Sequence, residues 1–312
     1  MILGQTFQFP FEITLIKWLQ QFLSNYPFLI RLLSILTDLG DATVPAVFIG
    51  FLYWGYDKKS GITMAMQALC STTANGMIKN LVMRRRPYFD NESIECLKAV
   101  DDRYDIYDIA GQGFSFPSGH ATNSGSFLTS LYLFYRNRKI LFYGSIIVFL
   151  VCLSRIVLGV HYPTDVLAGL LLGIAVSAFL SYAMDHFHKT KIYLCILLIG
   201  MVGFFFCHSN DFYSSYGLLL GFTTGDLFEE RYIWFDNTRN AFRILLRLIG
   251  GTIVFMIVAE GLKIPFSVIF MESDTFLAHL FRTFRYGLAC FVSIGIYPYL
   301  FRYDIFKLND RK

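Results

Sequence analysis

The sequence predicts an all-α membrane protein, a polytopic helical bundle with about eight or nine spans and interfacial helices at its N-terminus. Two observations of composition predict it. The 312 residues are 55% hydrophobic and only 16% charged, whereas an ordinary soluble domain has about 25% charged residues. Phe (33 residues) and Tyr (19 residues) are abundant, as is typical of membrane interfaces. The third observation is a series of apolar stretches that each approach the length needed to cross a bilayer.

Residues 1–40 are predicted to form an amphipathic N-terminal segment. Polar residues interrupt its apolar stretch 11–38, namely Lys17, Gln20, Gln21 and Arg31. We therefore expect one or two amphipathic helices at the membrane interface, with a spanning helix as the alternative. We expect no cleavable signal peptide, because a basic region, a short apolar run and a small-residue cleavage site are not found together here.

Nine later segments are the expected spans: 42–57, 61–83, 119–135, 140–158, 163–184, 192–207, 213–226, 241–260 and 282–303. Segment 213–226 is short and polar, so a re-entrant or broken helix is the alternative there. The polar motifs described below all fall within residues 41–185, which we expect to form the functional core. Residues 186–312 are expected to add further transmembrane helices.

Basic residues in short loops predict the orientation. If the spans are right, one side of the membrane receives Lys58, Lys59, Arg136, Arg138, Lys139, Lys189, Lys191, Arg231, Arg239, Arg302, Lys307, Arg311 and Lys312. The positive-inside rule makes that side cytoplasmic. The net charge of +4 is small and scattered, so nucleic acid is not an expected partner.

The first polar motif runs from Lys79 to Pro87, and most of it follows an apolar segment. Lys79 and Arg86 are seven residues apart, so we expect them to share one helix face, with Pro87 ending the helix. Two cations on one face at membrane depth suit a phosphate, since arginine offers a planar fork and lysine a point charge. Arg84 and Arg85 are expected to reach toward lipid headgroups.

The second motif is Pro117-Ser118-Gly119-His120, which opens the next apolar segment. Ser118 can cap a helix, and Gly119 lets an oxyanion approach the backbone closely. Free N–H groups at a helix start form an anion site, into which His120 would point. A capping serine beside a buried histidine is the alternative.

The third motif is Ser154-Arg155, followed by His161 and Asp165. His161 and Asp165 are four residues apart, flank Pro163 and can meet across one helical turn. A carboxylate on one imidazole nitrogen fixes the tautomer and leaves the other nitrogen free to attack. A helix cap is the alternative role of Asp165.

Three other features are less specific. The acidic loop 88–116 is long enough for a lid or a lipid-entry flank, with a solvated connector as the alternative. Asn75 faces the site or joins neighbouring helices. The six cysteines, Cys70, Cys96, Cys152, Cys195, Cys207 and Cys290, lack the spacing of a zinc site, and a disulfide framework is not expected.

Together the three motifs resemble the tripartite phosphatase signature of the type 2 phosphatidate phosphatase superfamily. The order and spacing match over roughly residues 40–185. The 88–116 loop and the C-terminal helices look more like the sphingosine-phosphate phosphatase branch and its bacterial relatives.

The resemblance implies roles for individual residues. His161 is the nucleophile that forms a phosphohistidine, Asp165 orients it, and His120 moves protons to and from the leaving group and water. The phosphoryl oxygens would be held by Lys79, Arg86, Ser118, Gly119 and Arg155. The family's independence of metal ions is plausible here, because no metal-ligand cluster accompanies the motifs, and no cofactor is expected.

The resulting hypothesis is a phosphatase of the bacterial inner membrane whose site faces the extracytoplasmic side and whose partner is a phosphorylated lipid. An isoprenoid pyrophosphate such as undecaprenyl pyrophosphate, a phosphatidate, a phosphatidylglycerophosphate and a sphingoid-base phosphate are all open as substrates. Phosphotransfer to another hydroxyl, hydrolysis of a soluble phosphate, haloperoxidase chemistry and non-enzymatic lipid binding or transport are the alternatives.

Overall fold

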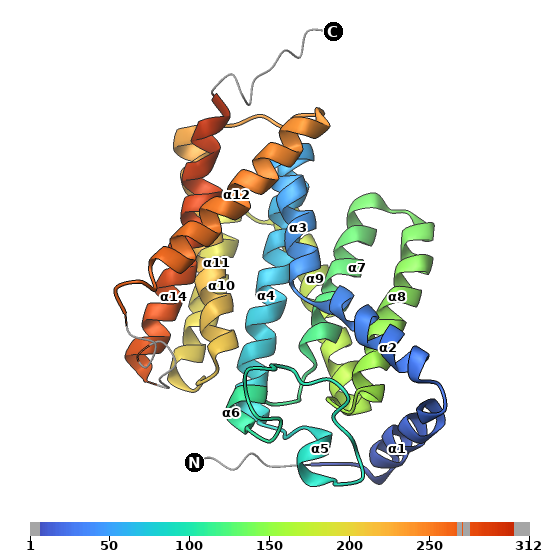
Figure 1. The fold of residues 1–312 in the computed structure, drawn as a ribbon. Helices are drawn as coiled ribbons and strands as arrows, with labels where there is room; N and C mark the ends of the chain where they lie inside the picture. Colours follow the sequence, from blue (N-terminus) through green and yellow to red (C-terminus); the bar gives the residue numbers. More distant parts are fainter. Residues whose placement is uncertain (1–6, 267–269, 271–274, 303–312) are drawn as a thin grey trace. The chain divides into compact units, whose positions relative to one another are not determined.

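A computed structural model of the chain describes residues 7–266, 270 and 275–302 (Figure 1). Every regular element within these ranges is helical, which confirms the predicted all-α class. Residue 303 and the basic residues Lys307, Arg311 and Lys312 lie outside the described residues. The chain divides into two compact units: unit 1 comprises Met1–Pro45 and Ala74–Phe179, and unit 2 comprises Ala46–Thr73 and Leu180–Lys312.

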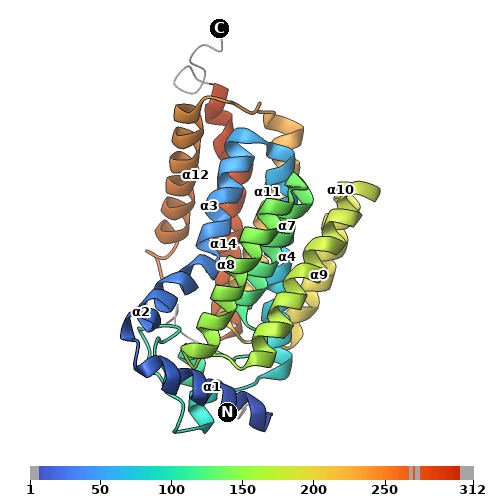
Figure 2. The ribbon, with the colours of Figure 1, turned by 90° about the vertical axis from the view of Figure 1, so that its right-hand side faces the viewer.

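Unit 1 carries the three polar motifs. Its elements are α1 (Pro10–Ser24), α2 (Pro27–Leu36), the 3-10 helix η1 (Thr37–Gly40), the end of α4 (Lys58–Val82), α5 (Pro87–Asp90), α6 (Ile109–Gln112), α7 (Gly119–Tyr135), α8 (Arg138–Val157) and most of α9 (Pro163–His186). Helices α7 and α8 form an antiparallel pair, and α1, α5 and the 88–116 loop gather near one end of it (Figures 1 and 2). Ile16 of α1, Ile94 of the loop and Val160 share an apolar cluster there.

Helix α9 packs against α7 at backbone contact distance. A Cβ atom on Gly169 would lie 2.4 Å from the carbonyl oxygen of Ser118, and one on Gly173 would lie 2.2 Å from that of Thr122. Any larger side chain at these two positions would push the helices apart. This close approach places Asp165, in the first turn of α9, next to the start of α7.

Unit 2 consists of most of α3 (Thr43–Phe51), the start of α4, the end of α9 and the C-terminal helices. The remaining elements are η2 (Leu52–Tyr56), α10 (Lys189–Met201), η3 (Val202–Phe205), α11 (Asn210–Phe228), η4 (Glu229–Ile233), α12 (Ala241–Gly261), α14 (Phe276–Phe291), η5 (Val292–Ile296) and η6 (Tyr297–Arg302). Helices α11 and α14 meet through glycines, since a Cβ atom on Gly221 would lie 2.1 Å from the carbonyl oxygen of Gly287. Small residues spaced by four allow such contact between membrane helices.

Each of the nine expected spans contains a helix, but fewer pass a test of length and apolar composition. Among the described residues four helices pass: α8, α9, α12 and the continuous stretch Phe276–Arg302. A fifth is added if Pro27–Gly40 and Thr43–Tyr56, which are separated by a bend, count as one broken span. The chain is therefore an integral membrane protein, while the count of eight or nine spans is not reproduced. Helices α7 and α10 are too short, with 17 and 13 residues.

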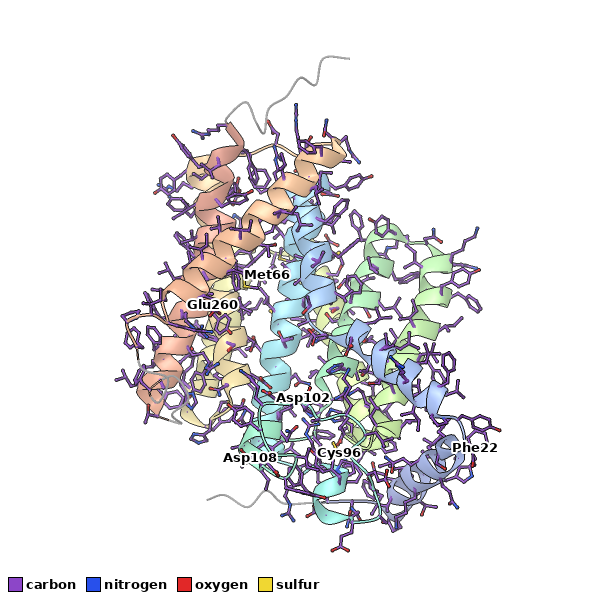
Figure 3. The ribbon with its side chains drawn as sticks, in the orientation of Figure 1. Phe22, Met66, Cys96, Asp102, Asp108 and Glu260 are labelled. Carbon is purple, nitrogen blue, oxygen red and sulfur yellow. The ribbon has the colours of Figure 1, made fainter. Side chains whose placement is uncertain are left out.

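Helix α1 has two faces of different character. Exposed side chains follow one face, with Phe11, Leu15, Trp18 and Phe22 each more than a third exposed, and Figure 3 shows Phe22 pointing outward. Glu12, Ile16 and Leu23 are buried on the other face. This pattern is typical of a surface helix, and the location of α1 at the membrane interface stays a prediction.

Candidate active site

His161 lies in the short loop that joins α8 to α9. Gly159 allows this loop to turn, because its φ is +76° and a Cβ atom there would lie 2.2 Å from the carbonyl oxygen of Glu95. The His161 side chain is buried, with Nε2 3.3 Å from Nη1 of Arg86. Its other nitrogen, Nδ1, lies 3.6 Å from Oδ2 of Asp165. That separation is longer than a hydrogen bond, and catalytic contacts often shorten only when substrate binds.

The surroundings of His161 keep its imidazole neutral. Burial lowers the pKa of His161 well below its ordinary value of 6.5, and the positive charges of Arg86, Arg155 and Lys79 lower this pKa further. A neutral imidazole has a lone pair on one nitrogen and is therefore the nucleophilic form. Because Nε2 faces Arg86 and Nδ1 faces Asp165, Nε2 is the nitrogen placed next to a cation that can hold phosphate.

Asp165 is fully buried at the start of α9. Its Oδ1 accepts a hydrogen bond from Nη1 of Arg84 at 2.6 Å, and its Oδ2 accepts one from the backbone N–H of Tyr162 at 2.8 Å. Its own backbone carbonyl accepts from the N–H of Ser118 at 3.0 Å. The second and third motifs are thus joined through their backbones, and the carboxylate is held from two sides.

The cations of the site come from three different segments. Arg86 is buried, and its guanidinium donates to the carbonyl oxygen of Gln112 at 2.8 Å and of Val160 at 2.9 Å. Arg155 on α8 is buried as well and donates from Nη1 to Oγ1 of Thr37 at 3.0 Å. Lys79 on α4 is 9% exposed. Arg86 therefore links the 88–116 loop to the His161 loop, and Arg155 links α8 to η1.

Several polar groups of the site are buried with unused hydrogen-bonding capacity. Among the described residues, Oγ of Ser118, Nε of Arg155 and Nδ1 of His161 have no hydrogen-bond partner. Ser118 stands at the N-cap of α7, yet its side chain makes no capping bond, so the capping role considered for it is not observed. A Cβ atom on Gly119 would meet nothing within 4 Å, which leaves room for a ligand at its backbone.

His120 follows in the first turn of α7, within electrostatic range of the positive charges of Arg155, Lys79 and Arg86. Asn75 on α4 supports the turn before it. Its side-chain amide donates to the carbonyl oxygen of Pro117 at 3.3 Å and to Oγ1 of Thr122 at 2.9 Å. Asn75 therefore joins α4 to α7, as the helix-packing alternative predicts.

The 88–116 loop is bonded to the segments that carry the site. The N–H of Leu97 donates to the carbonyl oxygen of Leu158 at 3.1 Å, and the N–H of Ser115 donates to that of Arg84 at 2.8 Å. These bonds fix the loop beside the His161 loop. Opening of this segment as a lid stays a prediction.

Two expectations about the first motif are wrong. Helix α4 ends at Val82 rather than before Pro87, and Met83 has a φ of +48°. Pro87 instead begins α5, so Lys79 and Arg86 do not share a helix face. The physical reason is that the buried guanidinium of Arg86 finds its acceptors in loop carbonyls, which a continuous helix would not reach.

Arg84 does not reach toward headgroups, because its side chain is fully buried. Its guanidinium lies 2.7 Å from Oε2 of Glu12 as well as 2.6 Å from Asp165. Sequence reasoning missed Glu12 altogether. The available signal was that Glu12 is the single acidic residue of α1. Arg85, in contrast, is partly exposed and pairs with Asp90 at 2.5 Å.

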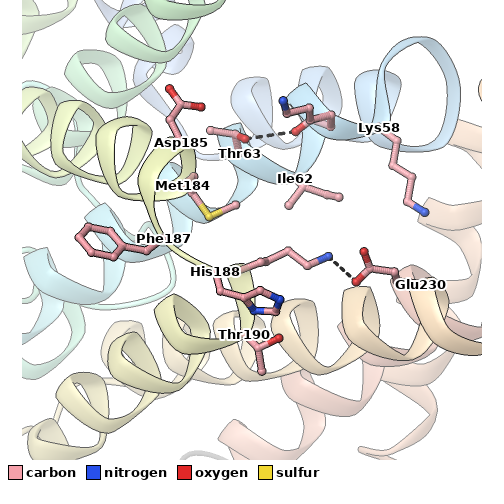
Figure 4. Close-up of a pocket in the computed structure, with 11 residues that line it drawn as sticks. Lys58, Ile62, Thr63, Met184, Asp185, Phe187, His188, Thr190 and Glu230 are labelled. Atoms are coloured by element: carbon pink, nitrogen blue, oxygen red, sulfur yellow. Dashed lines mark hydrogen bonds and ion pairs between the residues drawn. The ribbon is translucent and has the colours of Figure 1, made fainter.

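Figure 4 shows a pocket of about 880 Å³ in unit 2 that contains none of these residues. Lys189 on its wall lies 2.8 Å from both Glu230 and Asp226, and Lys58 pairs with Glu229. These ion pairs join α4 and α10 to the end of α11. Two of the pocket's lysines, Lys58 and Lys189, therefore already have carboxylate partners.

Comparison with known proteins shows two family matches. Residues 60–189 match the PAP2 superfamily, and residues 213–309 match the transmembrane extension of PAP2 superfamily phosphatases. The placement near the sphingosine-phosphate phosphatase branch stays a prediction.

Individual relatives are phosphatases. The chain is 28% identical over 198 residues to glucose-6-phosphatase catalytic subunit 1 of Mus musculus, and this aligned region covers 55% of this chain and 53% of the relative. It is 29% identical over 139 residues to lipid A 4'-phosphatase of Porphyromonas gingivalis, which covers 42% and 56%. The chain thus spans about half the length of the curated relatives it matches. No solved structure matches it.

Proposed function

Because the chain belongs to the PAP2 superfamily, we propose that it is an integral membrane phosphatase that hydrolyses a lipid phosphate or pyrophosphate through a phosphohistidine. The observation that carries this proposal is the environment of His161. One of its nitrogens faces the guanidinium of Arg86 and the other faces the carboxylate of Asp165. A nucleophile and an orienting carboxylate therefore lie in one loop and the helix that follows it, and Arg86 brings a phosphate-binding cation to them from the segment before α5.

In the first step, Nε2 of His161 attacks phosphorus and forms an N–P bond, while the bond from phosphorus to the lipid oxygen breaks. His120 gives its proton to that leaving oxygen. Negative charge on the phosphoryl oxygens is stabilised by the three cations of the site, together with the Ser118 hydroxyl and the Gly119 N–H. Asp165 stabilises the positive charge that develops on His161.

In the second step, His120 takes a proton from water, and the water oxygen attacks phosphorus. The N–P bond breaks, which releases inorganic phosphate and returns neutral His161. Over the two steps, His161 accepts and releases the phosphoryl group, and His120 donates and regains a proton. This chain supplies every group that the two steps use, so we propose that the reaction needs no metal ion.

A lipid is the substrate that the membrane setting favours. The relatives include lipid A phosphatases, and the site lies where a headgroup can reach the cations while its acyl chains stay in the bilayer. From the positive-inside rule we propose that the site faces the extracytoplasmic side. The similarity to bacterial lipid A phosphatases favours a bacterial inner membrane.

Phosphate release from a substrate panel tests the proposal. Purified full-length protein in detergent is given lipid A, phosphatidate, phosphatidylglycerophosphate, undecaprenyl pyrophosphate, a sphingoid-base phosphate and glucose 6-phosphate. We expect release from at least one lipid and none from the His161→Ala variant. Absence of release from every compound would overturn the proposal, and lipid binding unaffected by His161→Ala would then favour a binding or transport protein.

Orientation is tested by labelling introduced cysteines in whole cells. Asp102 is exposed in the 88–116 loop (Figure 3), and Lys191 is exposed on α10. In a cysteine-free background, a membrane-impermeant maleimide should label Asp102→Cys from outside and should label Lys191→Cys only after lysis. The reverse pattern would place the site in the cytoplasm.

A second candidate is hydrolysis of a soluble sugar phosphate, which the similarity to glucose-6-phosphatase favours. Turnover of glucose 6-phosphate without turnover of any lipid would select it. Phosphotransfer uses the same phosphohistidine, and transfer of phosphate to an added alcohol in place of water would reveal it.

A further inference from the structure

Arg84 occupies the centre of a buried chain of charges behind His161. Its Nη1 donates to Oδ1 of Asp165 at 2.6 Å, and its Nη2 donates to Oε2 of Glu12 at 2.7 Å. Its planar guanidinium is sandwiched between two aromatic rings, 4.2 Å from the centroid of Phe7 and 3.8 Å from that of Tyr162. Glu12, Arg84 and Asp165 therefore alternate in charge along a line that ends at His161.

Every nitrogen of the Arg84 guanidinium is engaged. Nε donates to the carbonyl oxygen of Phe7 at 2.8 Å, and Nη1 donates to Oγ1 of Thr164 at 2.7 Å in addition to Asp165. Nη2 serves Glu12. Arg84 therefore differs from Arg155, whose Nε is buried without a partner, and is not arranged to bind phosphate.

Glu12 is equally constrained at the other end of the chain. Its Oε1 accepts from Oγ1 of Thr164 at 2.6 Å and from the N–H of Thr164 at 3.1 Å, and its Oε2 accepts from the N–H of Phe9 at 3.1 Å. Burial alone raises the pKa of Glu12, but these hydrogen bonds and the charge of Arg84 outweigh it and leave that pKa below its ordinary value. Glu12 is therefore ionised at neutral pH.

The buried charges are hard to explain by stability alone. Removing ions from water offsets most of the attraction between them, so a buried ion pair gives little net stabilisation compared with apolar residues of the same size. What the arrangement does provide is geometry. Asp165 has one oxygen fixed by Arg84, which leaves the other oxygen directed toward Nδ1 of His161.

We propose that Arg84 and Glu12 are positioning residues that hold Asp165 against the nucleophile, so that helix α1 is a working part of the active site. This inference rests on the proposed phosphatase function. It assigns to the N-terminal segment a role that none of the three sequence motifs includes. Arg84 acts through Asp165 and makes no contact with the phosphoryl group.

The test compares adjacent arginines in the full-length enzyme. Arg84→Gln, Glu12→Gln and the control Arg85→Gln are assayed for kcat, KM and the inhibition constant of inorganic phosphate. Loss of a partner that orients a metal-binding side chain typically lowers activity about 10- to 100-fold, and we expect Arg84→Gln to lower kcat by a similar factor. KM and the inhibition constant should stay within about threefold, because the phosphate-binding cations are unchanged. Arg84→Lys should recover part of kcat, and Arg85→Gln should resemble the wild-type protein.

Glu12→Gln keeps the ion pair between Arg84 and Asp165 and preserves the shape of the side chain. If Arg84→Gln fails to fold, Glu12→Gln therefore tests the positioning role in its place. It should lower kcat several-fold, with the melting temperature measured alongside. Unchanged kcat in a folded variant would overturn the proposal. A rise in KM and in the phosphate inhibition constant would show that Arg84 binds substrate instead. Absence of turnover in the wild-type protein would overturn the phosphatase function itself. Turnover in the wild-type protein with unchanged kcat in the variants would overturn the positioning role alone.

Discussion

Replacing Arg86 with lysine keeps the positive charge but removes the planar fork. In the structure the guanidinium donates to the carbonyl oxygens of Gln112, Gly113 and Val160 and lies 3.3 Å from Nε2 of His161. These acceptors belong to two different loops. The ammonium of lysine has its three donors on one nitrogen, so it cannot reproduce the contacts that Arg86 makes from Nε, Nη1 and Nη2.

The expected loss has two parts. At least one buried carbonyl oxygen is left without a donor, which costs about 1–3 kcal/mol of folding stability. Loss of one preorganised donor to a developing anion typically lowers kcat by about 100- to 1,000-fold. Arg85→Lys is the matched control, because Arg85 is partly exposed and pairs with Asp90. Exposed ion pairs contribute about 0–1 kcal/mol, so this variant should stay close to the wild-type protein.

The assay measures kcat/KM on the best substrate of the panel and the melting temperature of each purified variant in detergent. We expect Arg86→Lys to lose activity and stability together and Arg85→Lys to keep both. If kcat/KM of Arg86→Lys stays within about threefold of the wild-type value, the fork geometry does not matter and the reasoning is refuted.

Three further predictions follow from particular contacts. Ser118→Ala should lower kcat by about 100-fold without lowering the melting temperature, because the Ser118 hydroxyl has no partner among the described residues; a large loss of stability would contradict this. Gly221→Ala should destabilise the protein by about 1–3 kcal/mol, because its Cβ atom would lie 2.1 Å from the carbonyl oxygen of Gly287. The control is Gly261→Ala, whose Cβ atom would meet nothing within 4 Å, and it should shift the free energy of unfolding by less than about 1 kcal/mol. Equal melting temperatures for the two variants would refute the packing argument. The pKa of Glu12 is lowered from its ordinary value of 4.5, so its stabilising contribution is present above pH 4.5 and is lost as pH falls through the folded-state pKa. Acid unfolding should therefore be shallower for Glu12→Gln than for the wild-type protein, and identical acid profiles would refute it.

The sequence predicted those parts of the site that depend on local spacing. His161 and Asp165 are four residues apart across the start of a helix, so their approach to 3.6 Å follows from helix geometry. The second motif likewise starts α7 where expected. The helices themselves were predictable from apolar stretches of sufficient length.

Contacts between distant parts of the chain were not predictable in this way. The Glu12 and Arg84 pair joins residues 72 positions apart, and neither periodicity nor a motif signals it. The end of α4 at Val82 depends on carbonyl acceptors that Arg86 finds 26 residues later in the 88–116 loop. The span count differs in part because two of the expected spans, α7 and α10, form helices of only 17 and 13 residues.

The central claim is that His161 carries the phosphoryl group during turnover. Rapid acid-free quenching of the enzyme with ³²P-labelled lipid phosphate, followed by peptide mapping, measures this directly. The label should be found on the His161 peptide with the acid lability of a phosphohistidine, and both the label and turnover should be absent from His161→Ala. Turnover by His161→Ala at the wild-type rate, or label on a different residue, would contradict the account.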